Sequence, residues 1–100
     1  MKKIEFKLYG QVLTGRPYGA QVFKELQEKF KSDEVEMDFS GVVSLGSSFG
    51  EEVVVPFAKK QENKMKINSA SQAVKRSLEL IAKDFNLNLE FVKYDRINNA

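Results

Sequence analysis

The sequence of 100 residues contains no cysteine, no histidine and no tryptophan. Without cysteine the chain can form no disulfide, no thiolate metal site and no thiol nucleophile. Without histidine it lacks the commonest general base and metal ligand, and with them every Ser-His-Asp arrangement. We therefore expect a protein that is not an enzyme and that needs neither a metal nor a cofactor. The absence of cysteine also fits a reducing compartment, so we expect a cytoplasmic protein.

The chain also has little excess charge and no long apolar run. Sixteen basic residues stand against fourteen acidic ones, a balance too even for a protein held on nucleic acid by electrostatic attraction. No apolar run approaches the ~20 residues of a membrane-spanning helix. The basic segment 1–5 is not followed by the apolar stretch of a secretory signal. We expect neither nucleic acid nor a membrane as a partner.

Hydrophobic side chains recur with two different periods along the chain. The strict alternation that is typical of strands occupies residues 3–9, 35–39, 64–67 and 87–92. The spacing of three and four that is typical of amphipathic helices occupies residues 20–31, 47–61 and 72–85. Between them, segment 11–19 carries three glycine or proline residues and indicates a loop. We predict an α/β fold, a small single domain over residues 1–93 with about four strands in a mostly parallel or mixed sheet and three helices, and a frayed polar tail over residues 94–100.

Two helix starts carry the spacing of a capping box, in which a serine satisfies a free backbone amide and a residue three positions on reaches back. Ser48 with Glu51 has this spacing, and so has Ser69 with Gln72. Pro56 falls inside the second predicted helix, where it removes one hydrogen bond. We expect the helix to continue through Pro56 with a bend.

The first candidate site is the segment 15–19, Gly-Arg-Pro-Tyr-Gly. A glycine-rich loop that runs into a helix can hold an anion on its free amides, with Arg16 as a clamp and Gly19 closing the loop. No phosphate-binding fingerprint follows, however, and glycine and proline serve turns first. A turn is therefore the more frequent meaning of this segment.

Three further groups of polar residues are candidates for a site. The hydroxyl groups in segment 38–51 could accept a phosphate or bind an anion, but a serine at a helix start more often caps the helix. Lys75 and Arg76 could meet an acidic partner, although they fit an ordinary solvated helix face equally well. We expect Glu36 and Asp38 to point to opposite faces of their strand, and so not to form a catalytic pair.

Segments 38–42 (Asp-Phe-Ser-Gly-Val), 48–52 (Ser-Phe-Gly-Glu-Glu) and 67–80 occur in the order and spacing of a known pattern. With Arg16 and Gly19 before the first helix, the sequence resembles the STAS-like domain family of unknown function. That family is related to the STAS domains of bacterial anti-sigma-factor antagonists. The resemblance implies a small sheet with helices packed largely on one side.

In the antagonists a partner kinase, which is also the anti-sigma factor, phosphorylates the first serine of a Ser-Ser pair. By position that serine is Ser47. The resemblance therefore implies a non-catalytic regulatory module that binds a protein, such as a histidine-kinase-like ATPase, as a monomer or a weak homodimer. The implied partner-binding residues are Ser44, Gly46, Ser47, Ser48, Phe49 and Glu51. One alternative is a small-ligand or nucleotide-binding domain that uses the loops at Arg16–Gly19 and Gly46–Ser48. Another is a purely structural subunit of a homo-oligomer.

Overall fold

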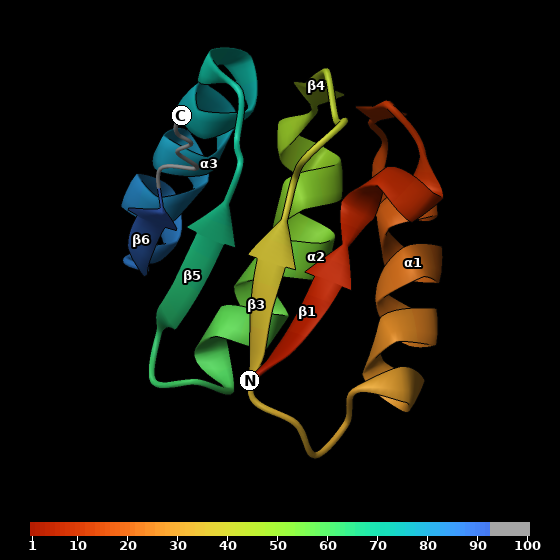
Figure 1. The fold of residues 1–100 in the computed structure, drawn as a ribbon, viewed down its shortest axis with the longest axis vertical. Coiled ribbons are helices and arrows are strands. Elements are labelled where there is room, and N and C mark those ends of the chain that lie inside the picture. Colours follow the sequence, from red (N-terminus) through yellow and green to blue (C-terminus); the bar gives the residue numbers. More distant parts are fainter. Residues whose placement is uncertain (93–100) are drawn as a thin grey trace, which may run out of the picture.

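The computed structural model describes residues 1–92 (Figure 1). The predicted tail over residues 94–100 lies outside the described residues. The elements follow in the order β1 (Lys2–Glu5), the 3₁₀ helix η1 (Phe6–Tyr9), β2 (Val12–Leu13), α1 (Arg16–Lys29), β3 (Val35–Asp38), β4 (Ser44–Leu45), α2 (Ser47–Lys59), β5 (Lys64–Asn68), α3 (Gln72–Phe85) and β6 (Asn88–Val92).

The main sheet has four strands in the order β1-β3-β5-β6, and each neighbouring pair is parallel. The chain thus moves across the sheet in one direction, with one helix in each crossover. Because parallel crossovers share one hand, all three helices lie on the same face, behind the sheet in Figure 1. The predicted α/β class, with three helices and helices largely on one side, is confirmed.

The core lies between the sheet and the helices. The rings of Phe6 and Phe39 stack 4.7 Å apart at 5°, and Phe23 meets Phe57 edge-on at 5.4 Å. The largest fully buried side chains are Phe6, Phe39, Phe49, Phe57, Ile4, Leu13, Leu26, Met37, Met65, Ile67, Leu78 and Ile81. Each helix thus buries one stripe, as the helical spacing in the sequence predicts.

The opposite face of the sheet carries polar side chains and no helix of the described residues. Glu36 and Asp38 of β3 both lie on it, because their neighbours Val35 and Met37 are buried. The expectation that the two carboxylates point to opposite faces was wrong, since side chains two residues apart in a strand share a face. The Asn68 amide donates to Glu36 at 2.8 Å, and Asp38 accepts from the Ser40 amide at 2.9 Å.

The predicted first strand is shorter than expected. It ends at Glu5, which forms the last residue pair with β3, opposite Asp38. The chain then turns into η1, and Leu8, which the alternation placed in the core, is 70% exposed.

The segment 11–19 is more ordered than a loop. Helix α1 begins at Arg16, four residues before the predicted start, with Pro17 in its first turn. Proline suits this place because the first amides of a helix have no partner within it. Before the helix, Val12 and Leu13 pair with Ser44 and Leu45 in a second, two-stranded parallel sheet that the pattern did not predict.

Neither predicted capping box forms. Helix α2 begins at Ser47 with Gly46 as its N-cap and no side-chain cap, so Ser48 already lies inside the helix. Helix α3 is capped two residues later than predicted, by Ser71, which accepts from the Val74 amide at 3.2 Å. The second helix does continue through Pro56, as expected.

Candidate functional site

The residues around Ser47 lie at the carboxyl end of the main sheet, where α2 begins. Ser47 is exposed and is the first residue of the helix, whereas Ser44 and Gly46 are half-buried. The Gly46 amide donates to the Leu13 carbonyl at 2.8 Å, and a side chain at Gly46 would come within 3.1 Å of Thr14 Cγ2. The helix start is therefore fixed against β2 by the backbone, and it presents the Ser47 hydroxyl to solvent.

Behind Ser47 the same turn is part of the core. Phe49 is 1% exposed, and its ring centre lies 5.5 Å from that of Tyr18. Ser48 and Glu51 are half-buried. Of the implied partner-binding residues, Ser47 is thus the most accessible, and Phe49 can affect a partner only through the residues that it supports.

Arg16, at the start of α1, forms hydrogen bonds with two glutamates of the neighbouring helix α2. Its Nη1 donates to Glu52 Oε2 at 2.7 Å and its Nη2 to Glu51 Oε1 at 3.0 Å. These hydrogen bonds, with Glu52 first, raise the pKa of the Arg16 guanidinium above its usual value. An anion that used Arg16 as a clamp would have to displace both carboxylates.

Gly19 explains why α1 and α2 approach so closely. A Cβ atom there would lie 3.0 Å from Glu52 Cβ and 3.1 Å from both Phe49 Cα and the Phe49 carbonyl oxygen. Arg16 and Gly19 on α1 therefore meet the 49–52 segment on α2. The structure brings these two sequence motifs together, and their contact is one of helix packing and ion pairing.

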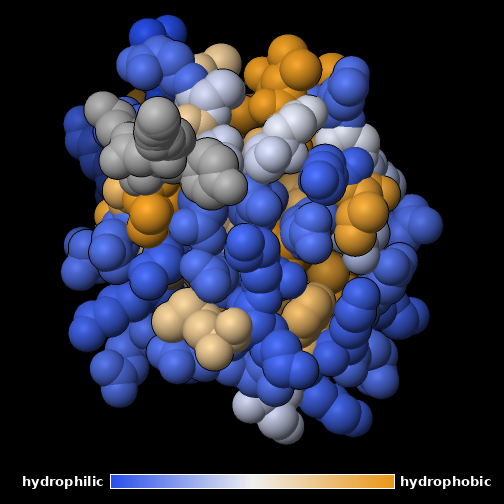
Figure 2. All heavy atoms as spheres, viewed as in Figure 1, coloured by the Kyte–Doolittle hydropathy of each residue, from blue (hydrophilic) through white to orange (hydrophobic). Residues whose placement is uncertain are grey.

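Exposed apolar side chains gather around this end of the sheet. Val12 is 61% exposed and Val43 60%, and both border the two-stranded sheet that leads into Ser47. Leu8 and Tyr18 are also among the exposed large hydrophobic residues. Figure 2 shows apolar atoms at the top of the molecule, over β4. Val12 and Val43 could not be predicted as exposed from the sequence, because a strand of two residues is too short a pattern to show which side chain faces solvent.

Tyr9 links η1 to the first helix. Its hydroxyl donates to Glu25 Oε2 at 3.0 Å, while its carbonyl accepts from the Tyr18 hydroxyl at 2.6 Å. Burial and then the hydrogen bond to Glu25 raise the pKa of Tyr9 to about 12.

We predict that Tyr9 makes the protein lose stability in alkali. An unfolded tyrosine titrates near pKa ~10, whereas folded Tyr9 keeps its proton to about 12. The contribution of Tyr9 is therefore complete below about pH 10 and falls as the pH rises from 10 to 12. Urea unfolding of the wild-type protein and of Tyr9→Phe across this pH range measures the contribution of Tyr9 to the free energy of unfolding. The absorbance of tyrosinate follows the titration of the tyrosines. A difference between the two proteins that stays constant with pH would contradict the prediction.

The third candidate, Lys75 with Arg76, lies on α3. The Lys75 ammonium stands 5.3 Å from the centre of the Phe91 ring, and Arg76 is exposed. The two side chains are on an ordinary helix surface.

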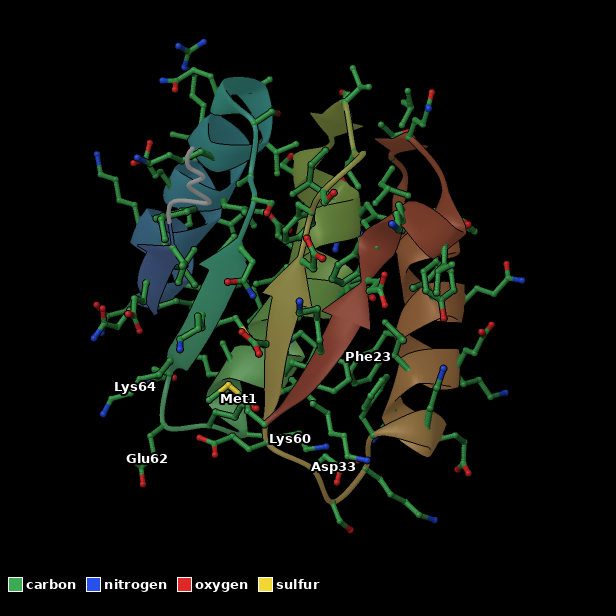
Figure 3. All side chains as sticks on the ribbon, in the orientation of Figure 1. Met1, Phe23, Asp33, Lys60, Glu62 and Lys64 are labelled. Atoms are coloured by element: carbon green, nitrogen blue, oxygen red, sulfur yellow. The ribbon has the colours of Figure 1, made fainter. Side chains whose placement is uncertain are left out.

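A cavity lies at the other end of the sheet from Ser47. It measures about 640 Å³ and opens where β3 and β5 diverge. Figure 3 shows Asp33, Lys60, Glu62 and Lys64 around it. The Gln61 carboxamide bridges the strands here, accepting from the Val35 amide at 2.6 Å and donating to the Val35 and Lys64 carbonyls at 3.2 Å. The Gln61 side chain thus replaces the backbone hydrogen bonds that β3 and β5 do not form with each other at this end.

Residues 1–92 contain no cluster of acidic side chains suited to a metal ion. In the same residues, no helix is long and apolar enough to cross a membrane.

A parallel four-stranded sheet with three helices on one face defines a small α/β domain consistent with a STAS-like fold. The chain belongs to the family described as the STAS-like domain of unknown function (DUF4325), whose family model matches residues 18–75. No curated protein and no solved structure gives a significant match to the sequence.

Proposed function

We propose that this protein is a non-catalytic regulatory module that binds another protein at the carboxyl end of its sheet. The docking surface consists of Val12, Tyr18, Val43, Ser44 and Ser47. The observation that carries the proposal is the exposure of Val12 and Val43 beside the accessible Ser47 hydroxyl. Exposed apolar side chains that are rimmed by polar groups are typical of protein-binding surfaces.

The kind of partner that we propose comes from the STAS family. In the related antagonists the partner is a kinase-like ATPase that serves as the anti-sigma factor. A histidine-kinase-like ATPase is therefore the first candidate, and a cytoplasmic protein that acts without a cofactor is consistent with it.

Phosphorylation of Ser47 would supply a switch for this surface. A phosphate adds about −1.5 to −2 charges at pH 7, and the start of a helix favours negative charge by about 0.3–1 kcal/mol. Glu51 and Glu52 would oppose that charge, although Arg16 lies between their carboxylates and offsets one of the two negative charges. Next to Val12 and Val43, a dianion would disrupt an apolar interface and release the partner.

Binding to ATPases that are encoded beside this gene tests the docking surface. Val43→Asp places a charge in the surface and is expected to weaken the complex by at least about tenfold. Leu80→Asp is the matched control. Leu80 is about as exposed as Val43, at 61%, but it lies on α3 and is not part of the docking surface. Equal effects of the two variants, measured by calorimetry, would place the partner elsewhere.

A second experiment separates docking from the switch. Incubation with the bound ATPase and ATP, followed by mass spectrometry, should show a phosphate on Ser47 that Ser47→Ala lacks. Ser47→Ala should still bind, whereas Ser47→Asp should bind weakly. If the ATPase binds but Ser47 is not phosphorylated, the proposed switch is wrong and the proposed docking function is retained.

The alternative is a nucleotide-binding domain, and a thermal shift assay tests it. A ligand at 100 times its dissociation constant stabilises a protein by about 2.7 kcal/mol. Stabilisation by a nucleotide, together with failure to bind any ATPase, would favour this alternative over protein docking.

A further inference from the structure

The face of the main sheet opposite the helices is a patterned surface of charges. We call it the open face, and it is turned toward the viewer in Figure 1. Parallel sheets are usually covered on both faces, and here only one is covered by helices of the described residues. The strands alternate accordingly, with charged or polar side chains on the open face and Ile4, Met37, Met65 and Ile67 beneath.

One row across the open face alternates in sign from strand to strand. Lys3 pairs in register with Glu36, and Lys66 pairs with Glu90. Met37 pairs with Ile67, so the preceding residues, Glu36 and Lys66, are next to each other in the row, at the point where β3 and β5 begin to diverge. Read across β1, β3, β5 and β6, the row is therefore positive, negative, positive, negative.

The four charged side chains of the row form no salt bridge with other described residues. The salt bridges found there join Lys7 to Glu5 and Arg16 to Glu51 and Glu52, none of which involves the row. Glu36 accepts a hydrogen bond from Asn68 and remains half-buried, as does Lys66. Lys3 and Glu90, at the two edges, are exposed. The row can therefore make contacts outside the chain.

An alternating row of four charges is complementary to itself. If a second copy faces the first about a two-fold axis parallel to the strands, the strand order reverses. Lys3 then lies opposite Glu90, and Glu36 opposite Lys66, and each contact occurs twice. An axis across the strands would instead set each charge opposite itself. We propose that the open face is the interface of a homodimer with its two-fold axis along the strands.

The next row explains why the association would be weak and sensitive to salt. Glu5 and Asp38 would face Val92 and Asn68 of the second copy, so this row adds carboxylates without cationic partners. Exposed ion pairs contribute little individually and are screened by salt. The dimer should therefore form at high protein concentration and low ionic strength.

The geometry of this dimer bears on the docking surface. Because the axis runs along the strands, the carboxyl ends of both sheets point the same way. Both Ser47 hydroxyls would lie at one end of the dimer, where a two-fold symmetric partner could engage both copies and gain avidity. The dimer stands without the proposed function, since its interface shares no residue with the docking surface.

Two charge reversals test the pairing of the central strands. Glu36→Lys changes the row to three positive charges and one negative, and Lys66→Glu to one positive and three negative. In each homodimer two attractive contacts become repulsive, which should weaken dimerisation by about tenfold or more. An equimolar mixture of the two variants should restore dimerisation, because every positive charge again faces a negative one.

Sedimentation velocity over a concentration series in low and high salt measures the dimer, and circular dichroism confirms that each variant is folded. Recovery in the mixture supports the proposal, because two damaged chains would not rescue each other. Wild type that stays monomeric at the highest attainable concentration in low salt would overturn it. Reversed variants that dimerise like wild type, or a mixture that stays monomeric while wild type dimerises, would also overturn it.

Discussion

Phe49→Ala is expected to lower the free energy of unfolding by about 3–5 kcal/mol, the range for truncating a buried phenylalanine. Phe49 is 1% exposed, its ring lies against Tyr18, and its backbone lies within close reach of Gly19. Truncation of the ring would leave a void beside Tyr18, between α1 and α2. Urea unfolding measures the loss, which for a domain of this size also lowers Tm by roughly 4–8 °C per kcal/mol.

Leu80→Ala is the control for this prediction. Leu80 is 61% exposed, so its truncation should change the free energy of unfolding by less than about 0.5 kcal/mol. A loss below about 1 kcal/mol in Phe49→Ala would show that the ring is not packed as described. Phe49 would then again be a candidate for direct contact with a partner.

The long periodic segments of the sequence predicted their elements well, and the short ones did not. Helix α3 shows Val74, Leu78 and Ile81 on one buried face, as its spacing requires. The strand pair of Val12 with Ser44 was missed because two residues show no period. The order of strands in the sheet depends on long-range pairing, which no local pattern contains.

Both capping boxes were wrong for a related reason. The spacing of Ser48 and Glu51 is local, but the start of α2 is fixed by the hydrogen bond from Gly46 to Leu13, which lies on a distant strand. In α3, Ser69 adopts a left-handed conformation with φ 57°, so it cannot serve as the extended N-cap, and Ser71 does so. Tertiary contacts decide between neighbouring serines that the sequence leaves equivalent.

The sequence predicted which elements carry the candidate residues, but not how those residues are arranged in space. The pattern predicts that Ser47 lies at the start of a helix, and Ser47 is the first residue of α2. Arg16 was considered as an anion clamp, yet it binds Glu51 and Glu52, which are more than thirty residues away in sequence. Only the fold shows that these three charges lie together and that Arg16 compensates one of the two carboxylates.

Gly19→Val is expected to lower the free energy of unfolding by about 3 kcal/mol, at the upper end for overpacking a core. Replacing a helical glycine by alanine ordinarily gains about 1 kcal/mol from helix propensity. At Gly19 the sign reverses, because a Cβ atom would come within 3.1 Å of Phe49 backbone atoms, which cannot rotate away. Gly19→Ala should therefore already be destabilising, and the two further methyl groups of valine should add to the loss.

The neighbouring position supplies the control for Gly19→Val. Ala20 is exposed on the same helix, so Ala20→Val should cost only about 0.5 kcal/mol of helix propensity. Separation of α1 from α2 would also stretch the Arg16 contacts to Glu51 and Glu52, so the effects of Gly19→Ala and Arg16→Ala should not add. A Gly19→Val protein as stable as wild type would mean that α1 can move away from α2 at no cost. In that case the paired motifs at 16–19 and 49–52 would have to be explained by a partner rather than by the packing of two helices.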